Sequence, residues 1–207
     1  MGISCEFKQV SSYVLGKLKQ EPTLFYALRH ADRISTLEDY YKFGGLLWRD
    51  QSEEIELDIY QVLSEGRIEG FSVDKSWHEL HYLLTNNSSW EFNNLAFLID
   101  ENLNGDNMPL INIVLGGTAI EECETGYGSL RYLISDEVRQ VVQAFSKISE
   151  EGLRKRYEQA ETLKPRLYSC DWGLKHDVED FLELYDAVVE YYQDAAIKED
   201  AMLIYLT

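Results

Sequence analysis

Apolar residues at the two ends of the chain follow the patterns of strands. Ile3, Cys5 and Phe7 alternate with polar residues, and this period of two predicts a strand with one buried face. The chain finishes with an apolar run over residues 201–206. A run without alternation is typical of a strand that is covered on both faces. Both ends of the chain are therefore expected to supply strands to the core.

Two further strand patterns lie in the middle of the chain. Residues 110–115 form a second continuous apolar run, closed by two glycines, and we predict a doubly covered strand there. After a glycine-containing turn, Leu130, Tyr132 and Ile134 alternate with less apolar positions, which predicts another strand.

Helical periodicity separates these strands. We predict a helix over 76–85, where Ser76 and Glu79 fit a capping box at its start. The longest predicted helix covers residues 175–198, with apolar residues every three or four positions. Residues 31–70 carry weaker signals, and we expect short helices and turns in that segment.

Together these patterns predict an α+β protein, folded as a single compact domain over residues 1–207. We expect a mixed sheet whose N-terminal, central and C-terminal strands pack against several helices. No apolar run reaches the roughly 20 residues that span a bilayer, and Glu6 and Lys8 stand where a signal peptide needs apolar residues. The three cysteines form no CxxC pair and are expected to be buried apolar side chains, as in a reducing compartment. We therefore expect a cytoplasmic protein.

The charge balance limits the classes of partner. The chain has 37 acidic and 19 basic residues, so its formal net charge is −18. A negative field of this size repels nucleic acids and anionic membranes, and neither is expected as a partner. The oligomeric state stays open, and aromatic residues such as Tyr40, Tyr41 and Tyr191, if exposed, offer one route to self-association.

A set of short motifs recurs through the second half of the chain. The motifs are DKSWH at 74–78, HYLLT at 81–85, the glycines at 116–117 and 126–128, RYL at 131–133 and the helix that carries Val138. Together they resemble the YfbM-like family of bacterial proteins, a domain of unknown function, over 71–207 and the first strand. The resemblance implies a compact α+β fold, with no established reaction, catalytic residue or cofactor. Residues 31–70 and 100–108 exceed the family pattern, and we interpret them as family-variable insertions.

One group of residues has the composition of a metal or small-molecule site. On a helical wheel His78 and His81 lie about 60° apart, with Asp74 between them, and histidine and carboxylate are common metal ligands. Tyr82, Tyr127 and Arg131 are further polar candidates for such a site. The competing interpretation is that both histidines are structural and hydrogen-bond to backbone or water.

The predicted C-terminal helix carries a stripe of carboxylates. The stripe consists of Glu179, Glu183, Asp186, Glu190 and Asp194. These side chains fall within about 80° of one another on a helical wheel, and between 171 and 200 only Lys175 and Lys198 oppose ten acids. The stripe is either a solvated face or a surface that meets a basic protein.

Two hypotheses of function follow. The first is a non-catalytic protein-binding module, in one form an immunity protein that neutralises a basic toxin such as a nuclease. The alternative is a small enzyme or a metal- or small-molecule-binding protein that uses Asp74, His78 and His81.

Overall fold

The computed structural model describes residues 2–36, 39–40, 53–89, 99–100, 108–168, 172 and 177–207. Five strands form one sheet in the order β2-β1-β7-β6-β5. These strands are β1 (Cys5–Val10), β2 (Phe71–Asp74), β5 (Thr118–Thr125), β6 (Gly128–Leu133) and β7 (Ala201–Leu206). A second, two-stranded sheet pairs β3 (Ile99–Asp100) with β4 (Leu110–Ile111).

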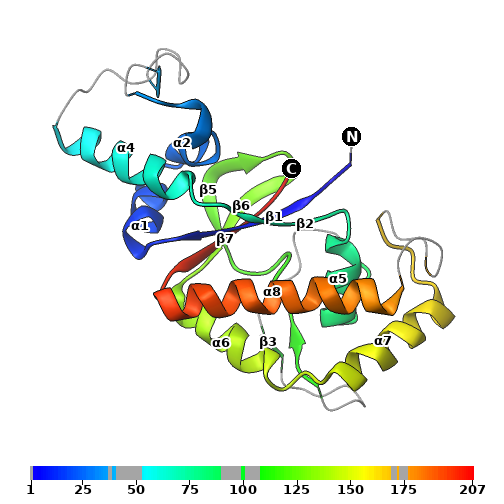
Figure 1. The fold of residues 1–207 in the computed structure, drawn as a ribbon. Coiled ribbons are helices and arrows are strands. Elements are labelled where there is room, and N and C mark those ends of the chain that lie inside the picture. Colours follow the sequence, from blue (N-terminus) through cyan, green and yellow to red (C-terminus); the bar gives the residue numbers. More distant parts are fainter. Residues whose placement is uncertain are drawn as a thin grey trace.

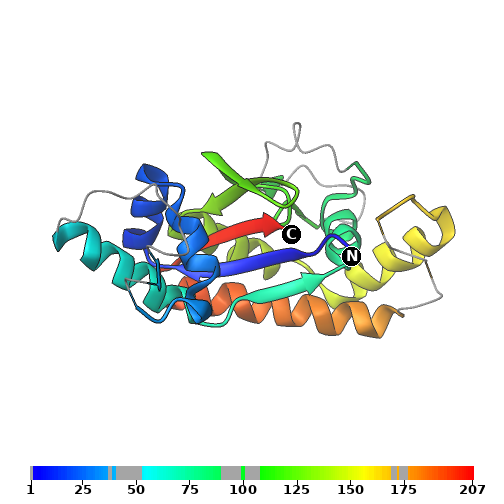
Figure 2. The same ribbon diagram turned by 90° about the horizontal axis from the view of Figure 1, so that it is seen from above.

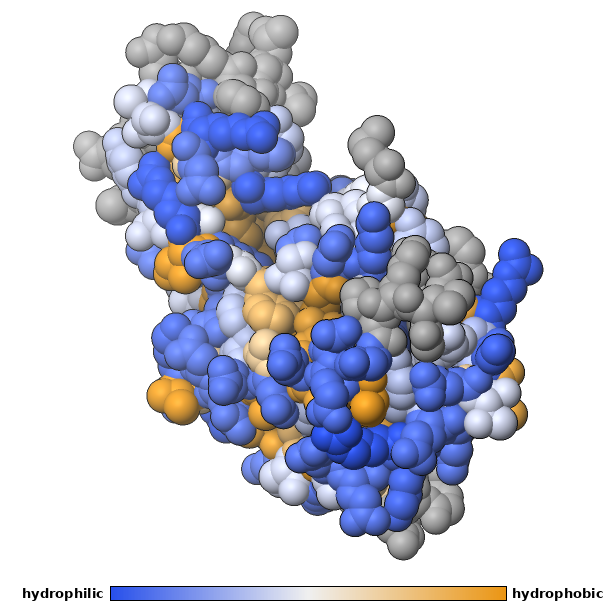
Figure 3. Space-filling model, turned by 45° about the vertical axis from the view of Figure 1, so that its right-hand side comes forward, coloured by the Kyte–Doolittle hydropathy of each residue, from blue (hydrophilic) through white to orange (hydrophobic). Residues whose placement is uncertain are grey.

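Helices cover both faces of the large sheet (Figures 1 and 2). On one face lie α1 (Ser12–Gln20), α2 (Leu24–Arg29), the short 3-10 helix η1 (Ala31–Arg33) and α4 (Glu53–Gly66). On the other face lie α5 (Trp77–Thr85), α6 (Ser135–Phe145), α7 (Glu150–Leu163) and α8 (Val178–Lys198). In Figure 3 hydrophilic residues cover most of the visible face, and apolar residues gather between the upper-left helical lobe and the lower helical layer.

The α+β class predicted from the sequence is confirmed, but the expectation of a mixed sheet is wrong. Every strand pairing that the structure describes in the large sheet is antiparallel. β5 and β6 form a hairpin, and a hairpin joins antiparallel neighbours. The two ends of the chain also pair antiparallel, with Cys5 opposite Leu206 and Val10 opposite Ala201.

The two terminal strands behave as their patterns predict. Cys5 and Phe7 are buried against α5, α6 and α8, while Lys8 and Val10 belong to the opposite face of β1. In β7, Ile204 packs against the layer of α5, α6 and α8, and Leu203 packs against the layer of α1, α2 and α4. A strand with helices on both faces has no solvent-facing side, which explains the continuous apolar run.

Residues 111–115 of the central run are buried as expected and Leu110 is half-buried, but the run is a strand only at Leu110–Ile111. The Oδ1 atom of Asn112 accepts a hydrogen bond from the Leu115 N–H at 3.0 Å, which bends the chain into a turn. A side chain at Gly116 would place its Cβ 2.0 Å from the Asn112 carbonyl oxygen, so only glycine permits this close approach.

The segment 31–70 contains a longer helix than expected. α4 has 14 residues where short helices and turns were predicted. Ile59, Val62 and Leu63 lie at helical spacing and are buried against α1 and α2, and this short stripe is easily missed among the surrounding acids. Residues 37–38, 41–52 and 101–107, which include parts of both proposed insertions, lie outside the described residues.

No helix within the described ranges combines the length and the apolar character that crossing a membrane requires.

Candidate functional site

The helix α8 is anchored to the core by a row of aromatic side chains. Tyr185 and Tyr192 contact the Phe145 ring edge-on, at centroid distances of 5.6 and 5.8 Å. Tyr192 also meets Phe7 of β1 at 5.7 Å. Edge-to-face contacts of this kind stabilise a core beyond simple burial. The buried face of α8 is therefore fixed against both α6 and the sheet.

Both ends of α8 are capped. Asp177 Oδ1 accepts hydrogen bonds from the N–H groups of Glu179 and Asp180, at 3.0 and 3.1 Å. At the other end Glu199 takes a left-handed conformation, and the Asp200 N–H donates to the Ala195 carbonyl at 2.9 Å. Such caps satisfy the backbone groups that a helix leaves unpaired. The result is a rigid rod of 21 residues, about 30 Å long.

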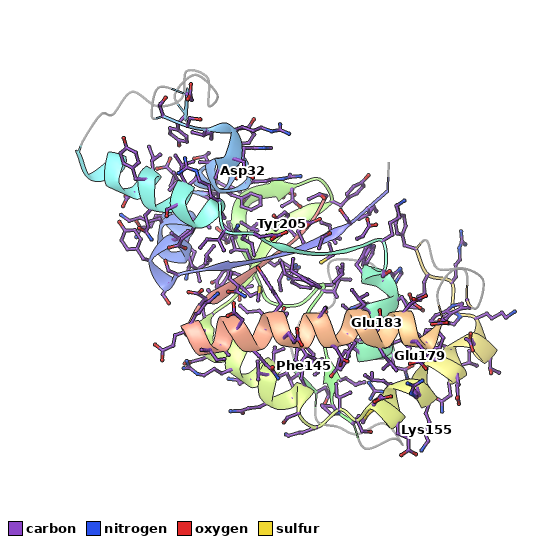
Figure 4. The ribbon with its side chains drawn as sticks, viewed as in Figure 1. Asp32, Phe145, Lys155, Glu179, Glu183 and Tyr205 are labelled. Atoms are coloured by element: carbon purple, nitrogen blue, oxygen red, sulfur yellow. The ribbon has the colours of Figure 1, made fainter. Side chains whose placement is uncertain are left out.

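The predicted carboxylate stripe lies on the outer side of this rod. We call it the α8 acidic face, and it consists of Glu179, Glu183, Asp186, Glu190 and Asp194. The first four side chains are exposed and Asp194 is half-buried, so the wheel prediction of a shared outward face is confirmed. Figure 4 shows Glu179 and Glu183 on the half of α8 that lies nearest α7.

The two ends of the α8 acidic face are neutralised within the molecule. Arg154 of α7 reaches Glu179 with Nη2 at 2.8 Å from Oε2, and it also binds Glu150 on its own helix. The hydrogen bond from Arg154 lowers the pKa of the Glu179 carboxyl. At the far end Lys198 pairs with Asp194 one turn away and lowers the pKa of that carboxyl.

In the middle of the α8 acidic face the carboxylates are not neutralised by described residues. Glu183, Asp186 and Glu190 are exposed, and none of them forms an ion pair or a side-chain hydrogen bond with another described residue. They follow one another at spacings of three and four residues, so their Cα atoms span about 10 Å of the rod. Like charges at these spacings repel by a few tenths of a kcal/mol per pair. This arrangement therefore adds nothing to the stability of the isolated helix.

The structure does not bring Asp74, His78 and His81 together as a ligand set. Asp74 is exposed with a left-handed φ of 43°, whereas both histidines are only 1% exposed. Within the part of the chain that is described, no group of three or more His, Cys, Asp or Glu side chains could hold a metal ion.

His78 is held by backbone groups. Its Nδ1 atom accepts a hydrogen bond from the Tyr168 N–H at 2.8 Å, and its Nε2 lies 3.2 Å from the Ser88 carbonyl oxygen. A neutral ring with the proton on Nε2 satisfies both contacts. The ring also stacks on Trp77 at 4.8 Å. Burial lowers the pKa of His78, so this side chain connects three segments as a neutral group.

His81 lies deeper and is more strongly perturbed. Burial, with a smaller contribution from His78, lowers the pKa of His81 to about 3, while the nearby Asn112 side chain acts in the opposite direction. The Thr85 hydroxyl donates to the His81 carbonyl at 2.6 Å. A proton on this ring would have to be held where water is excluded, which is costly. The structural interpretation therefore accounts for the hydrogen bonds of His78, whereas the buried Nδ1 atom of His81 has no hydrogen-bond partner among the described residues.

The further polar candidates lie in separate places. Tyr82 lines a cavity of about 590 Å³ between α5 and α7, beside the buried Arg156. The guanidinium of Arg156 is held there by the carbonyl oxygens of Leu83 and Met108, at 3.0 and 3.3 Å. Tyr127 and Arg131 line a different cavity of about 290 Å³ along β6 and β7. These residues do not form one site with the histidines.

Two other sequence expectations are settled by burial. Tyr40 is buried, and Tyr191 is half-buried with its hydroxyl 3.4 Å from the Phe7 carbonyl oxygen. Neither is therefore the fully exposed aromatic that this route to self-association requires. Tyr41 lies outside the described residues. Cys5 and Cys123 are buried thiols, as predicted. Burial raises the pKa of both, that of Cys123 to about 11. Cys170 lies outside the described residues.

The sequence analysis did not identify the two basic residues, Lys198 and Arg154, that form ion pairs at the ends of the α8 acidic face. Lys198 follows Asp194 by four residues, and this spacing was a readable signal of an ion pair. Arg154 lies 25 positions before Glu179 in the chain. Only the packing of α7 against the first turn of α8 reveals that contact.

Comparisons with known proteins agree with this fold. No curated protein matches the sequence. The crystal structure of YfbM from Escherichia coli, a protein of unknown function, superposes with a TM-score of 0.53 at 14% sequence identity, over 100% of both chains. At that identity the likeness shows a shared fold alone. The family described as a domain of unknown function, DUF1877, matches residues 1–205, and the chain therefore belongs to the DUF1877 family.

Proposed function

We propose that this protein is a non-catalytic binding module that recognises a basic protein through the middle of the α8 acidic face. The observation that carries the proposal is the contrast along α8. Glu183, Asp186 and Glu190 are exposed and have no ion-pair partner among the described residues, whereas Glu179 and Asp194 on either side are paired.

Charge gives this surface a physical advantage in finding a cationic partner. A formal net charge of −18 attracts basic proteins over a distance, and electrostatic attraction of this kind raises association rates by about tenfold to a thousandfold at low salt. Three carboxylates on a capped helix are already ordered, so binding does not have to order the backbone that carries them. One form of the proposal is an immunity protein whose acidic face covers the basic cleft of a toxin.

An affinity-capture experiment with matched variants tests the proposal. The α8 variant combines Glu183→Lys, Asp186→Lys and Glu190→Lys. The control variant combines Glu121→Lys, Glu122→Lys and Glu158→Lys, three exposed acids on β5 and α7, and it changes the net charge by the same amount. Each tagged protein is used to capture proteins from a lysate of the native host.

The proposal predicts a protein that the wild type and the control variant retain and that the α8 variant loses. Equal retention by all three proteins would show that α8 is not the contact surface. Equal loss from both variants would show that bulk charge, rather than this face, holds the partner.

A further inference from the structure

A crevice of about 450 Å³ lies on the opposite face of the sheet from α8, next to the N-terminal helices. Its floor is formed by neighbouring strands, with Glu6 and Lys8 from β1, Ser72 from β2 and Tyr205 from β7. Its wall comes from α2, η1 and the connection between α4 and β2. Figure 4 labels Asp32 on the helical side and Tyr205 on the sheet side.

Lys8 is a buried cation at the base of this crevice. Lys8 is only 6% exposed. Its Nζ atom donates hydrogen bonds to the carbonyl oxygens of Gly66, at 2.9 Å, and Ile68. An ammonium has three donors. No described carboxylate forms a direct ion pair with Lys8, although Asp32 and Glu65 lie near enough to act on its charge and oppose the lowering of its pKa by burial. A buried charge is costly unless an opposite charge compensates it. Two carbonyl oxygens use two of the three N–H donors of Lys8, so the third can bind an anionic group in the crevice.

Tight packing of the backbone fixes the carbonyl groups that hold Lys8. A side chain at Gly66 would place its Cβ 2.4 Å from the Leu28 carbonyl oxygen, so the end of α4 lies directly against α2. A Cβ at Gly70 would lie 3.0 Å from the Phe7 carbonyl oxygen. The connection between α4 and β2 is thus held against both β1 and α2, and the Lys8 ammonium has a defined position.

Arg29 supplies a second cation beside the same crevice. Its guanidinium carbon lies 5.9 Å from the centroid of the Tyr205 ring, a distance typical of a cation–π contact. The side chain is exposed and forms no ion pair with a described residue. Its five N–H donors can therefore bind a carboxylate that enters the crevice.

Glu6 places a negative charge close to these cations. It lies opposite Tyr205 on β7 and opposite Ser72 on β2, and the Ser72 hydroxyl donates to Glu6 Oε1 at 2.8 Å. Glu6 and Lys8 are two residues apart on β1, so their side chains leave the same face about 7 Å apart.

We propose that this crevice binds a free α-amino acid. The ligand carboxylate binds Lys8 and Arg29, and its ammonium group binds Glu6. The two charged groups of an amino acid are separated by one carbon, and a hydrogen bond of about 2.8 Å at either end lets them reach two oppositely charged side chains several ångströms apart. Leu28 and the Tyr205 ring provide apolar surface for the side chain of the ligand.

The charge balance of the lining favours a zwitterion over a simple anion. Three acids, Glu6, Asp32 and Glu69, and three bases, Lys8, Arg29 and Arg67, line the crevice. A simple anion would meet the repulsion of these acids and of the protein's net charge of −18. A zwitterion offers a partner to both signs and brings no net charge.

Nuclear magnetic resonance titration of the full chain tests the proposal. The probes are the standard L-amino acids, added singly at millimolar concentration, followed by the N-acetyl and the amide derivatives of the strongest binder and by inorganic phosphate. We expect saturable shifts of the backbone amides of residues 5–8 and 66–72, and affinity at least about tenfold weaker for both derivatives.

No saturable shift with any amino acid would overturn the proposal. Equal binding of the N-acetyl derivative or of phosphate would also overturn it, since either result defines a site for anions alone.

Variants of the charged lining residues test whether the amino acid binds in the crevice. Arg29→Gln and Glu6→Gln change side chains that are exposed or half-buried, and each is expected to weaken binding at least about tenfold. Arg33→Gln removes an exposed charge from η1 outside the lining and is expected to leave affinity unchanged. If the control variant weakens binding as much as the site variants, the crevice is not the binding site. None of these residues belongs to α8, so this result is independent of the capture experiment.

Discussion

Two helices of this protein carry polar clusters that look alike in the sequence and differ in the structure. On α5, His78 and His81 are enclosed, and His78 has hydrogen-bond partners from two other segments. On α8, Glu183, Asp186 and Glu190 are displayed to solvent without an ion-pair partner among the described residues. Residue type and helical spacing suggested chemistry in both places.

The difference teaches that burial and partners, rather than residue type, separate a structural cluster from a recognition surface. Enclosed groups with partners contribute to stability, and their removal should unfold the protein. Displayed like charges cost stability, and their removal should not. The predictions below test both halves of this comparison, beginning with the largest effect.

The largest effect is expected at Trp77, which supports the histidine pair. Trp77 is fully buried, stacks on His78, and donates from Nε1 to the Ile3 carbonyl at 3.1 Å. Trp77→Ala should lower the free energy of unfolding by about 3–5 kcal/mol through loss of packing. Trp77→Phe keeps most of the volume and should cost less. Urea denaturation measures both, and a loss below about 1 kcal/mol for the alanine variant would contradict the assigned packing role.

Acid should destabilise the enclosed cluster through His81. The folded-state pKa is about 3, below the ordinary value of 6.5, so the unfolded chain binds more protons between these values. The stability contribution is complete above pH 6.5 and is lost as the pH falls towards about 3. Each pH unit in this window removes on the order of 1 kcal/mol, so the loss between pH 6.5 and about pH 5 is about 2 kcal/mol.

Urea denaturation at both pH values measures this loss. His78, with its lowered pKa, adds to it in the same direction. His81→Gln cannot take up the proton and should flatten the dependence. An unchanged slope in that variant would show that His81 is not the responsible group.

The rigidity of the displayed helix depends on its N-terminal cap. Asp177→Ala removes the acceptor for two backbone N–H groups and should cost about 1 kcal/mol. Hydrogen exchange should show faster opening of the first turn of α8. Glu190→Ala, in the middle of the helix, serves as the control and should leave exchange in the first turn unchanged. Equal exchange in the wild type and the Asp177 variant would argue against the cap.

The smallest effect, and one of opposite sign, is expected from neutralising the displayed carboxylates. Glu183→Gln, Asp186→Asn and Glu190→Gln together remove several repulsive pairs at helical spacing, so stability should rise by a few tenths to about 1 kcal/mol. The gain should shrink at high salt, because salt screens exposed charges. Denaturation at two ionic strengths measures it, and a clear loss of stability would give this face a structural role.

Local patterns predicted the fold better than they predicted the site. The apolar run 201–206 needed only its own residues to show a doubly covered strand, and the outward face of α8 followed from helical spacing. The 76–85 helix was also found, with Ser76 at its N-cap position, although no side-chain capping bond from Ser76 exists within the described residues.

Features that depend on distant segments were not predictable in this way. The enclosure of His78 requires Ser88 and Tyr168, which lie 10 and 90 positions away. The turn after Leu110–Ile111 depends on an Asn112 side chain within an apolar run. The crevice at Lys8 joins strands from both ends of the chain, and no local pattern contains that arrangement.

The central claim is that the middle of the α8 acidic face guides a basic protein into contact. The most direct measurement is the association rate constant of the captured partner with the wild type, the α8 variant and the charge-matched control variant at low ionic strength. We predict that the α8 variant associates roughly tenfold more slowly or worse, while the control stays within about twofold of the wild type. An α8 variant that associates as fast as the control would contradict the claim.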